Sequence, residues 1–569
     1  MITAGEQRAS AFCNLMAPAL VHESHTDSMT SVDLPNDCVV CSCRHGTYLF
    51  DFRTSMKTSD DLFRLVKSLS PAEKKYCKRM FSRHTTSSSI EKNDYVQLFD
   101  IVDSMSAWDE AIFKKKISKY GFAPRISAVK NYLISLLTEA MRSYAIGSTA
   151  QHLLLEMLAD IAIFWKRNLK DMALKLILKA KVLARQHEEW ELALKIQNWH
   201  LLAAESQPHK KADVLLLFEE KQYLLDHLNN VDHYRMLNSA IHEIFAQGAV
   251  TSEQTTRELA VILSDPLLSR EECALSHAAK LIFHDIHIIS EKLIKKQPET
   301  TIYHTRRRLE LHYERPDFIT EKPLSYITSV HRHVQRCIIF GLLDEAEDTL
   351  KKFDTTIVHI ADKLYESYRI EAAIMNMSME VLLILNTGNL QYIHSKHSRW
   401  KRGIVLYQEA MELQFTRGLC FNIALLFYFA QSWTDALYWL TKSMEYNLEV
   451  IPEIVAAGKM MSIMVHYELG NYSLIESLVR STSRYLKKHN FLGRSEQKVL
   501  LFFNQLSNTA EFTPQSPEPF RKMLAYLEKH SEDTRFSSIE FFDFRLWLRS
   551  KIEGVPLTEL YQQKVRIKE

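Results

Sequence analysis

The stretch Ser432–Glu445 reads SWTDALYWLTKSME, and its apolar residues recur at the spacing of one helix face. Ser432 is a suitable N-cap, Trp433 would be the first helical residue, and Ala436 and Leu440 follow on the same face. A small residue between bulky ones allows a second helix to approach closely. No side chain in the stretch is an obvious catalyst, so we interpret it as a helix that packs against its neighbours.

Three other stretches repeat this layout. In each, a bulky residue at position i is followed by an often small residue at i+3 and by another bulky residue at i+7. Each helix pair of this kind leaves one apolar face bare, and only another pair can cover that face. The repetition therefore predicts a succession of antiparallel helix pairs. The matching positions are Trp190, Ala193, Gln197 and His200; Leu343, Ala346, Leu350 and Phe353; and Tyr472, Ile475, Val479 and Thr482.

Composition also favours helices. The 569 residues include only 13 glycines and 14 prolines, and no proline occurs between Pro124 and Pro208 or between Pro323 and Pro452. Turn-rich β architectures need these residues to reverse the chain. A hydrophobic content of 46% with 25% charged residues is typical of a folded globular chain rather than a disordered one. The sequence therefore predicts an all-α fold.

Charge and hydropathy give no sign of a membrane. The formal net charge of +2 produces no global field that would attract nucleic acid or a lipid surface. The apolar run CFNIALLFYFAQSW is interrupted by Asn422 and Gln431 and is shorter than the ~18–20 residues of a bilayer span. The N-terminal stretch AFCNLMAPALV follows Glu6 and only one basic side chain, Arg8, which makes a poor secretory signal. We expect no membrane partner and a cytoplasmic location.

The pattern changes abruptly at Met56 and divides the chain into four segments. Residues 1–55 lack sustained helical periodicity, so we expect a poorly structured extension that contributes nothing to the fold, with Met56 as a candidate native start. A helical module follows at 57–146. Helix pairs occupy 150–505, and a C-terminal helical cap occupies 506–569.

The module at 57–146 begins with well-marked helices. Ser70, Pro71 and Glu73 have the spacing of a capping box, with serine at the N-cap, proline at N1 and glutamate at N3. Further helices are expected over Tyr95–Met105, around WDEAIFKKKI, and from Arg125 onward.

The same module is basic, with 16 Lys/Arg against 10 Asp/Glu, a net of +6. Five short helices with this skew could contact nucleic acid. We favour the alternative, a solvated helix face in an N-terminal cap, because no helix-turn-helix glycine turn is evident. The basic face comprises Lys74, Lys75, Lys78, Arg79, Lys114, Lys115 and Lys116.

Three groups have the spacing of metal ligands, but none forms a complete set. The N-terminal group lacks a second ligand pair at a defined distance, and two histidines one helical turn apart do not make a zinc site alone. We therefore expect no metal site. The groups are Cys38, Cys41, Cys43 and His45; His284 and His287; and His394 and His397.

Motifs of catalysis are also missing. The sequence contains no GxGxxG, GxxxxGK[ST], GxSxG or HExxH, and 13 glycines leave little material for a phosphate-cradling loop. The basic run HTRRRLELHYER, from His304 to Arg315, is typical of a solvated helix face. We therefore expect neither an enzyme nor a cofactor.

The repeated layout resembles the tetratricopeptide repeat, with better matched units at 417–447 and 456–486. Ala424 and Phe427 occupy the family's small and aromatic positions in the first helix, and the opening stretch corresponds to the second helix of that unit. The resemblance implies a superhelical α-solenoid. More loosely, SLSPAEKKYCKRMF and FFDFRLWLRSKIEG are similar to segments of uncharacterised bacterial helical-repeat proteins, a resemblance that implies no activity.

In tetratricopeptide arrays the first helix of each unit lines the concave face. The resemblance thus implies a scaffold that binds a protein or peptide there. Since the family's carboxylate-gripping Lys and Asn pattern is missing, we expect an apolar or amphipathic helical segment. A neighbouring helix covering these residues is the competing interpretation, and a signal-responsive regulator whose basic module contacts nucleic acid is the alternative function. The implied partner-binding residues are Phe421, Leu425, Tyr428, Phe429, Met460, Met464 and Tyr467.

Overall fold

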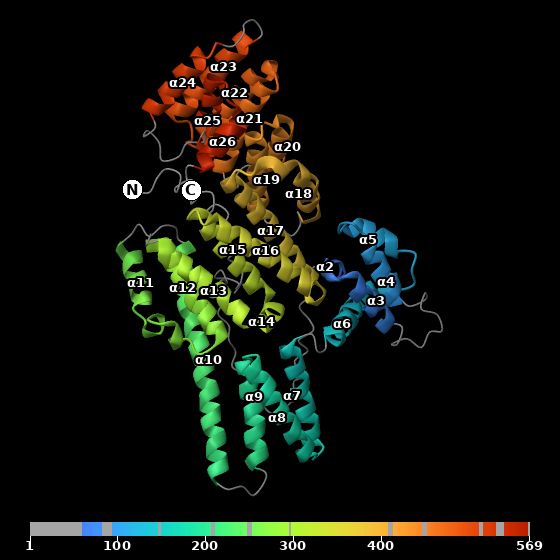
Figure 1. The fold of residues 1–569 in the computed structure, drawn as a ribbon. Helices are drawn as coiled ribbons and strands as arrows, with labels where there is room; N and C mark the ends of the chain where they lie inside the picture. The colour runs from blue at the N-terminus through green and yellow to red at the C-terminus, as the bar shows by residue number, and fades with distance from the viewer. Residues whose placement is uncertain are drawn as a thin grey trace, which may run out of the picture. The chain divides into compact units, whose positions relative to one another are not determined.

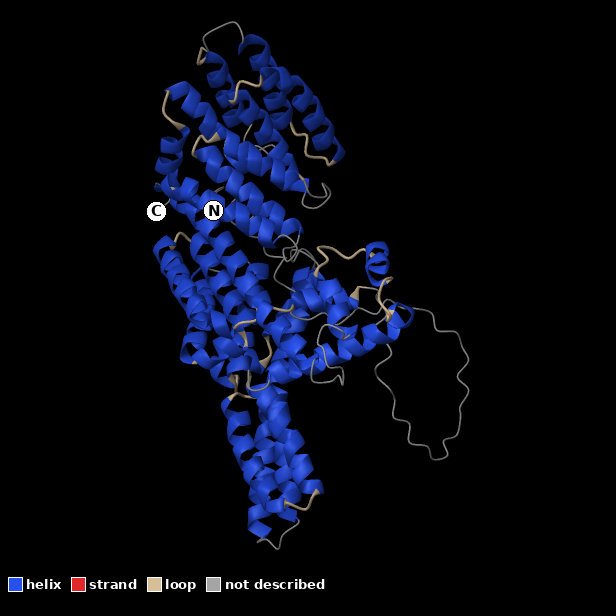
Figure 2. Ribbon diagram, turned by 90° about the vertical axis from the view of Figure 1, so that its right-hand side faces the viewer, coloured by secondary structure: helices blue, strands red, loops and turns tan. Residues whose placement is uncertain are grey.

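The computed structural model describes residues 60–81, 94–145, 149–205, 211–246, 253–294, 298–407, 413–445, 452–510, 516–530 and 540–566. Throughout these residues the chain forms helices joined by turns and contains no strand (Figure 2). The prediction of an all-α fold is confirmed for this part of the chain. The expectations for residues 1–55, including the cysteine–histidine group, lie outside the described residues.

The described chain divides into two compact units, an N-terminal unit up to Asn229 and a C-terminal unit from Asn230. This division falls inside α10 (Lys211–Ala246), whereas the sequence suggested boundaries near residues 146–150 and 505–506.

In the described part of the N-terminal unit, the first five helices enclose a core of their own. The capping box is confirmed, because the Ser70 amide donates to a Glu73 carboxylate oxygen (2.7 Å) and the Glu73 amide donates to the Ser70 hydroxyl (3.3 Å). The first of the described helices begins at Asp61, with Asp60 at its N-cap. These helices are α2 (Asp61–Ser68), α3 (Pro71–Phe81), α4 (Asp94–Asp103), α5 (Glu110–Ile117) and α6 (Ile126–Ala145).

Successive antiparallel helices complete the N-terminal unit and form most of the C-terminal unit (Figure 1). After the module come α7 (Ala150–Lys166), α8 (Lys170–Gln186), α9 (Trp190–Glu205) and the start of α10. The C-terminal unit contains α11 (Glu253–Leu263), α12 (His277–Ile294), α13 (Pro298–Glu314), α14 (Pro316–Glu321), α15 (Pro323–Ile339), α16 (Leu343–Ile360), α17 (Glu366–Thr387), α18 (Ile393–Tyr407), α19 (Leu413–Phe429), α20 (Trp433–Met444), α21 (Pro452–Glu468), α22 (Tyr472–Lys488), α23 (Arg494–Ala510), α24 (Glu518–Lys529), α25 (Phe544–Glu553) and α26 (Leu557–Arg566).

The same turn ends helix after helix. Between α19 and α20, the Ser432 amide donates to Phe427 O (2.9 Å) and the Gln431 amide to Tyr428 O (3.0 Å), the two bonds of a Schellman motif. Gln431 has a left-handed backbone conformation, with φ of 57°. Corresponding bonds occur at Asn168, Glu188, Gly341, Gly470 and Asn490, all with positive φ. A chain poor in glycine thus reverses direction with asparagine, glutamine and glutamate in most of these positions.

The four helix starts expected from the repeated layout are confirmed. α9, α16, α20 and α22 begin at Trp190, Leu343, Trp433 and Tyr472. Along the opening stretch, Ala436, Leu440 and Ser443 are all buried, as the packing interpretation requires.

Replacing Ala436 by leucine should destabilise the protein. Ala436 is fully buried in α20, so the added methyl and methylene groups would overpack its surroundings and cost roughly 1–3 kcal/mol. Urea unfolding measures the change. The matched control is Ala128→Leu on an exposed position of α6, which should be near neutral because alanine and leucine are both good helix formers. Equal stability of the two variants would remove the packing interpretation.

The C-terminal helix departs from a one-dimensional solenoid, in which each repeat contacts only its neighbours. The Thr558 hydroxyl in α26 donates to Phe429 O (2.8 Å), and the Gln562 side-chain amide donates to Gly388 O (3.1 Å). The buried side chains of residues 516–530 and 540–566 belong to the same core as those from Ile302 onward. The last helices therefore close over α17 and α19.

Among the described helices, one, α17, is long and apolar enough to cross a membrane by length and composition alone. The sequence prediction missed it because charged residues interrupt its apolar pattern. The Glu380 carboxylate of α17 accepts hydrogen bonds from three side chains: Lys396 Nζ (2.5 Å), Arg399 and the Trp400 indole N–H (3.0 Å). Half of the apolar stretch of α17 is buried within the protein. A buried stretch that contains a carboxylate paired with neighbouring cations is typical of a core helix.

Candidate functional site

The structure places all seven implied partner-binding residues in the core. None of them exposes more than 5% of its surface. The Phe429 ring stacks on Tyr561 of α26, with centroids 3.7 Å apart, and the Tyr467 ring lies edge-on to Trp547 of α25 at 6.0 Å. The competing interpretation, that neighbouring helices cover these residues, therefore describes the structure, and the concave-face assignment is corrected. The residues are Phe421, Leu425, Tyr428, Phe429, Met460, Met464 and Tyr467.

The lysines of the basic module are largely used by the fold. Lys74 Nζ lies 2.8 Å from an Asp103 carboxylate oxygen, and Lys78 Nζ lies 2.5 Å from one of Asp100, so α4 neutralises one face of α3. Lys116 Nζ donates to the Ser104 hydroxyl (3.1 Å), which places a further cation near the carboxyl end of α4, where the helix dipole favours positive charge.

The remaining predicted basic residues do not extend that cluster. Lys114 pairs with Glu110 within α5 at 2.8 Å, and Arg79 lies over the Tyr76 ring at 5.4 Å. Lys75 and Lys115 are exposed. The seven residues therefore do not form a single cationic surface.

A different exposed surface was missed by the sequence analysis. On one side of α8, four small or aliphatic side chains are buried against the neighbouring helices. The other side, which we call the α8 face, is exposed over about 140° of the helix circumference. Its apolar members expose 42% (Met172), 47% (Leu178) and 67% (Val182) of their surface. Lys175 and Lys179 lie between them. The full α8 face is Asp171, Met172, Lys175, Leu178, Lys179, Val182, Arg185 and Gln186.

The C-terminal unit contains a second unexpected feature, a buried polar layer formed by α12, α13, α15 and α16. The basic run at 304–315 is only partly solvated, which corrects the sequence prediction: His304, Arg308 and His312 are buried in this layer, whereas Arg306 is exposed. The reason is that neighbouring segments supply carboxylates to each arginine: Arg306 pairs with Glu345, Arg307 with Glu271, and Arg308 with Asp285.

Asp285 is the most enclosed of these carboxylates. Arg308 Nε lies 2.8 Å from its Oδ1, Arg308 Nη2 lies 3.0 Å from its Oδ2, and Arg332 of α15 also contacts Oδ1. Arg308 is 4% exposed. Burial would raise the pKa of the Asp285 carboxyl, but the charges of Arg308 and Arg332 outweigh it and lower the pKa. This carboxylate stays ionised because two guanidinium groups hold it.

In the two His-x-x-His pairs, the ring nitrogens make separate contacts within the chain. His284 Nε2 lies 3.1 Å from a Glu271 oxygen, whereas His287 Nε2 faces Leu268 O at 3.3 Å. In the second pair, His397 Nε2 accepts the Trp439 indole N–H at 3.1 Å. Each of these nitrogens already has a partner in its own chain.

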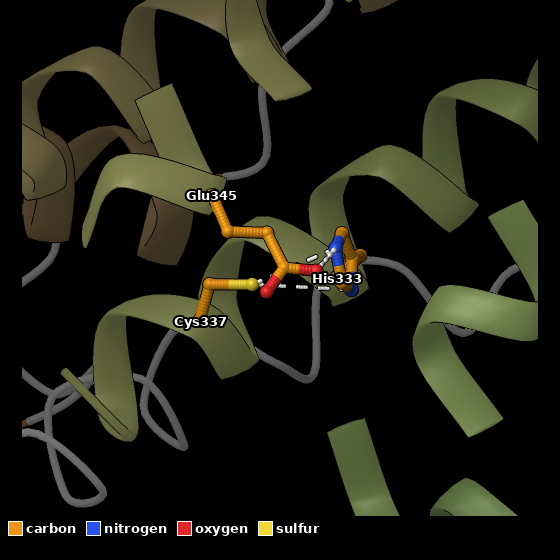
Figure 3. Close-up of side chains that lie close together, drawn as sticks. All are labelled: His333, Cys337 and Glu345. Atoms are coloured by element: carbon orange, nitrogen blue, oxygen red, sulfur yellow. Dashed lines mark hydrogen bonds and ion pairs between the residues drawn. The ribbon is translucent and has the colours of Figure 1, made fainter. Parts of the chain in front are cut away.

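Three other side chains do converge with metal-ligand chemistry. His333 and Cys337 lie one turn apart on α15, and Glu345 lies in the first turn of α16, just after the Gly341 turn (Figure 3). His333 Nε2 is 3.2 Å from Glu345 Oε1 and 3.6 Å from Cys337 Sγ. Thr305 Oγ1 of α13 lies 3.1 Å from His333 Nδ1. We call His333, Cys337 and Glu345 the α15–α16 triad.

The charge states in this triad follow from its surroundings. Burial raises the pKa of the Cys337 thiol to about 12, so the sulfur carries a proton near neutrality. Burial also lowers the pKa of His333. Arg306 donates to both Glu345 oxygens, at 2.7 and 2.8 Å, and these bonds lower the pKa of the Glu345 carboxyl.

The triad does not have the arrangement of a nucleophile with its base. In a catalytic triad the acid holds the imidazole nitrogen that faces away from the nucleophile. Here the same nitrogen, His333 Nε2, is nearest to both Cys337 and Glu345, while Thr305 holds the other. A raised thiol pKa also opposes nucleophilic reactivity.

A sequence signal for the triad existed only in part. His333 and Cys337 are spaced i, i+4, which places them on one helix face, but Glu345 comes from the next helix and no local pattern links it to them. Comparison of the chain with protein-family models, with curated proteins and with solved structures found no match.

Proposed function

We propose that this protein is a non-enzymatic interaction scaffold whose α8 face binds an acidic amphipathic helical segment of a partner protein. The observation that supports this is the amphipathic character of the α8 face. It carries three large apolar side chains next to three cationic ones and a single acidic residue. An exposed apolar surface bordered by charge is typical of an interaction site.

The chemistry of the partner follows from the spacing of the α8 face. Met172, Leu178 and Val182 offer apolar area along about three turns of helix, enough length for one docked amphipathic helix. Because Lys175 and Lys179 lie between these apolar side chains, they would meet carboxylates on the docked face of that segment. Arg185 is held by Glu220 at 2.5 Å, so the two lysines are the cations left for a partner.

Reversing both lysine charges should weaken the complex. In Lys175→Glu with Lys179→Glu, repulsion replaces attraction within the interface, and capture of the partner from the native cell should fall about tenfold or more, a change of roughly 1.4 kcal/mol. Thermal unfolding should be unchanged because both side chains are exposed. Affinity capture with quantitative mass spectrometry measures the loss.

The matched control is Lys75→Glu with Arg79→Glu, which reverses two exposed charges at the same i, i+4 spacing on α3. This control should retain the partner. A different outcome is that only the α3 variant loses its partner and that this partner is nucleic acid whose binding weakens steeply with salt. In that case the function is that of a regulator that contacts nucleic acid, and the scaffold proposal is wrong. If neither variant loses the partner, the α8 face is not the binding surface.

A further inference from the structure

One helix of the C-terminal unit, α22, presents almost only positive charge to solvent. It contains four basic residues and a single acidic one, Glu476. The four cations are exposed and lie within about 100° of the helix circumference, and we call them the α22 basic face. They are Arg480, Arg484, Lys487 and Lys488.

Little of this charge is neutralised within the described part of the chain. A Glu476 carboxylate oxygen lies 3.2 Å from Arg480, but the two side chains are 64% and 68% exposed, and a surface pair of this kind is weak. No described carboxylate pairs with Arg484 or Lys487. The face is therefore left with most of its charge for a partner.

Aromatic rings border the basic face at the carboxyl end of α22. Tyr485 lies about 60° from Lys488 around the helix. Its ring centroid is 4.4 Å from that of His489, and the Phe491 ring is nearly parallel to the His489 ring at 6.2 Å. All three rings are partly exposed.

A further cation lies beside these rings. Lys459 Nζ of α21 is 5.4 Å from the centroid of the Tyr485 ring. Burial alone lowers the pKa of Lys459, so no described carboxylate is close enough to offset its charge. The cationic surface thus continues from α22 onto α21.

The composition of this surface favours a polyanion over an apolar partner. Among the large apolar side chains of α22 only Leu474 is exposed, and it lies near the opposite end of the helix. An amphipathic peptide or a lipid surface needs apolar contact area beside the charges. Phosphates need only cations, and the unpaired bases of a single strand stack on aromatic and imidazole rings.

The spacing of the cations suits a chain of phosphates. Arg480, Arg484 and Lys488 repeat every four residues, so they follow one line along α22 at intervals of about 6 Å. A nucleic acid backbone carries one negative charge per nucleotide and can follow such a row.

We propose that the α22 basic face, together with the rings of Tyr485, His489 and Phe491, binds single-stranded nucleic acid. The cations contact the phosphates, and the rings stack with bases. The net charge of the whole chain is only +2, so binding depends on this local surface. The surface is separate from the α8 face, which belongs to the other unit, and the proposal does not depend on the scaffold function.

Fluorescence anisotropy of the full chain with labelled oligothymidylate and oligouridylate of about 15 nucleotides tests this binding. We expect both strands to bind, and the tighter one identifies DNA or RNA as the preferred strand. Four phosphate contacts predict a slope of about −3 for log K against log salt concentration. Unlabelled single strands should compete better than a duplex of the same length and better than polyglutamate.

Two variants assign the binding to α22. Arg484→Gln with Lys487→Gln should weaken binding about tenfold or more and reduce the salt slope by about 1.4. Thermal unfolding should be unchanged because both side chains are exposed. His489→Ala removes a stacking ring and should reduce the preference for single strands over the duplex.

The matched control is Lys351→Gln with Lys352→Gln, which removes two exposed cations from α16, where Glu347 and Asp348 already pair with Lys351. This control should bind as tightly as the parent. An α22 variant that binds like the parent, an equal loss in the control, or polyglutamate that competes as well as the oligonucleotides would overturn the proposal.

Discussion

Lowering the pH from 7 to 5 should destabilise the C-terminal unit by several kcal/mol. Burial lowers the pKa of His277 and of His284 to about 4, and that of His304 and of His312 to about 3. Each of these histidines belongs to the polar layer or borders it, and each is at least nine-tenths buried.

The sign follows from proton linkage. These histidines have a pKa near 6.5 in the unfolded chain and a lower pKa in the folded chain. As the pH falls, the unfolded chain therefore takes up protons before the folded chain does. Stability is therefore greatest above pH 6.5 and falls as the pH drops toward the folded-state pKa. Between pH 7 and pH 5 the loss is about 2 kcal/mol for each such histidine. Carboxylates with lowered pKa values, such as Asp285, add their loss only below about pH 4.

Chemical denaturation at half-unit intervals of pH measures this dependence. Two variants sharpen it: His304→Gln and His312→Gln should each reduce the slope of stability against pH by about one proton. Unfolding free energies that stay level from pH 7 to pH 5 would show that these histidines are not held neutral by burial.

Replacing Asp285 by asparagine should cost about 3–5 kcal/mol, since the change leaves two guanidinium groups in a largely buried place without their counter-ion. Arg308 is the more enclosed of the two, at 5% side-chain exposure against 19% for Arg332. Asparagine keeps the size of the side chain, so the loss reports charge rather than a cavity. Urea unfolding at pH 7 measures it.

The control is Glu310→Gln, which removes a carboxylate that is half exposed and lies 3.4 Å from Arg307. This surface pair should contribute no more than about 1 kcal/mol. A loss for Asp285→Asn no larger than the loss for the control would mean that Arg308 and Arg332 are solvated or find other partners, and that the polar layer is not held by this carboxylate.

Local features of the fold could be predicted, because they depend on residues close together in the sequence. The capping box at Ser70, the helix starts at Trp190 and Trp433, and the burial of Ala436 all rest on spacings of three or four residues. Helical periodicity carries this information directly.

The features that failed depend on distant partners. Phe429 lies on a helix whose pattern suits a concave surface, but Tyr561, more than a hundred residues later, covers it. Likewise, the sequence predicted solvated arginines in 304–315, because no residue nearby in the sequence indicates that Glu271, Asp285 and Glu345 will pair with them. The triad and the exposed α8 face were missed for related reasons. The triad joins residues of two helices, and the exposure of α8 is visible only once its neighbours are in place.

The proposed scaffold function depends on contact between a partner and the α8 face, and photocrosslinking from that face measures such contact directly. A photoreactive amino acid at Val182, 67% exposed, is compared in the native cell with one at Val358 of α16, 76% exposed. The account predicts that Val182 crosslinks to an acidic amphipathic helical segment of one partner, that this crosslink disappears in Lys175→Glu with Lys179→Glu, and that Val358 gives none. Equal crosslinking from both positions, no crosslink from Val182, or crosslinks from Val182 only to a second copy of the chain would contradict it.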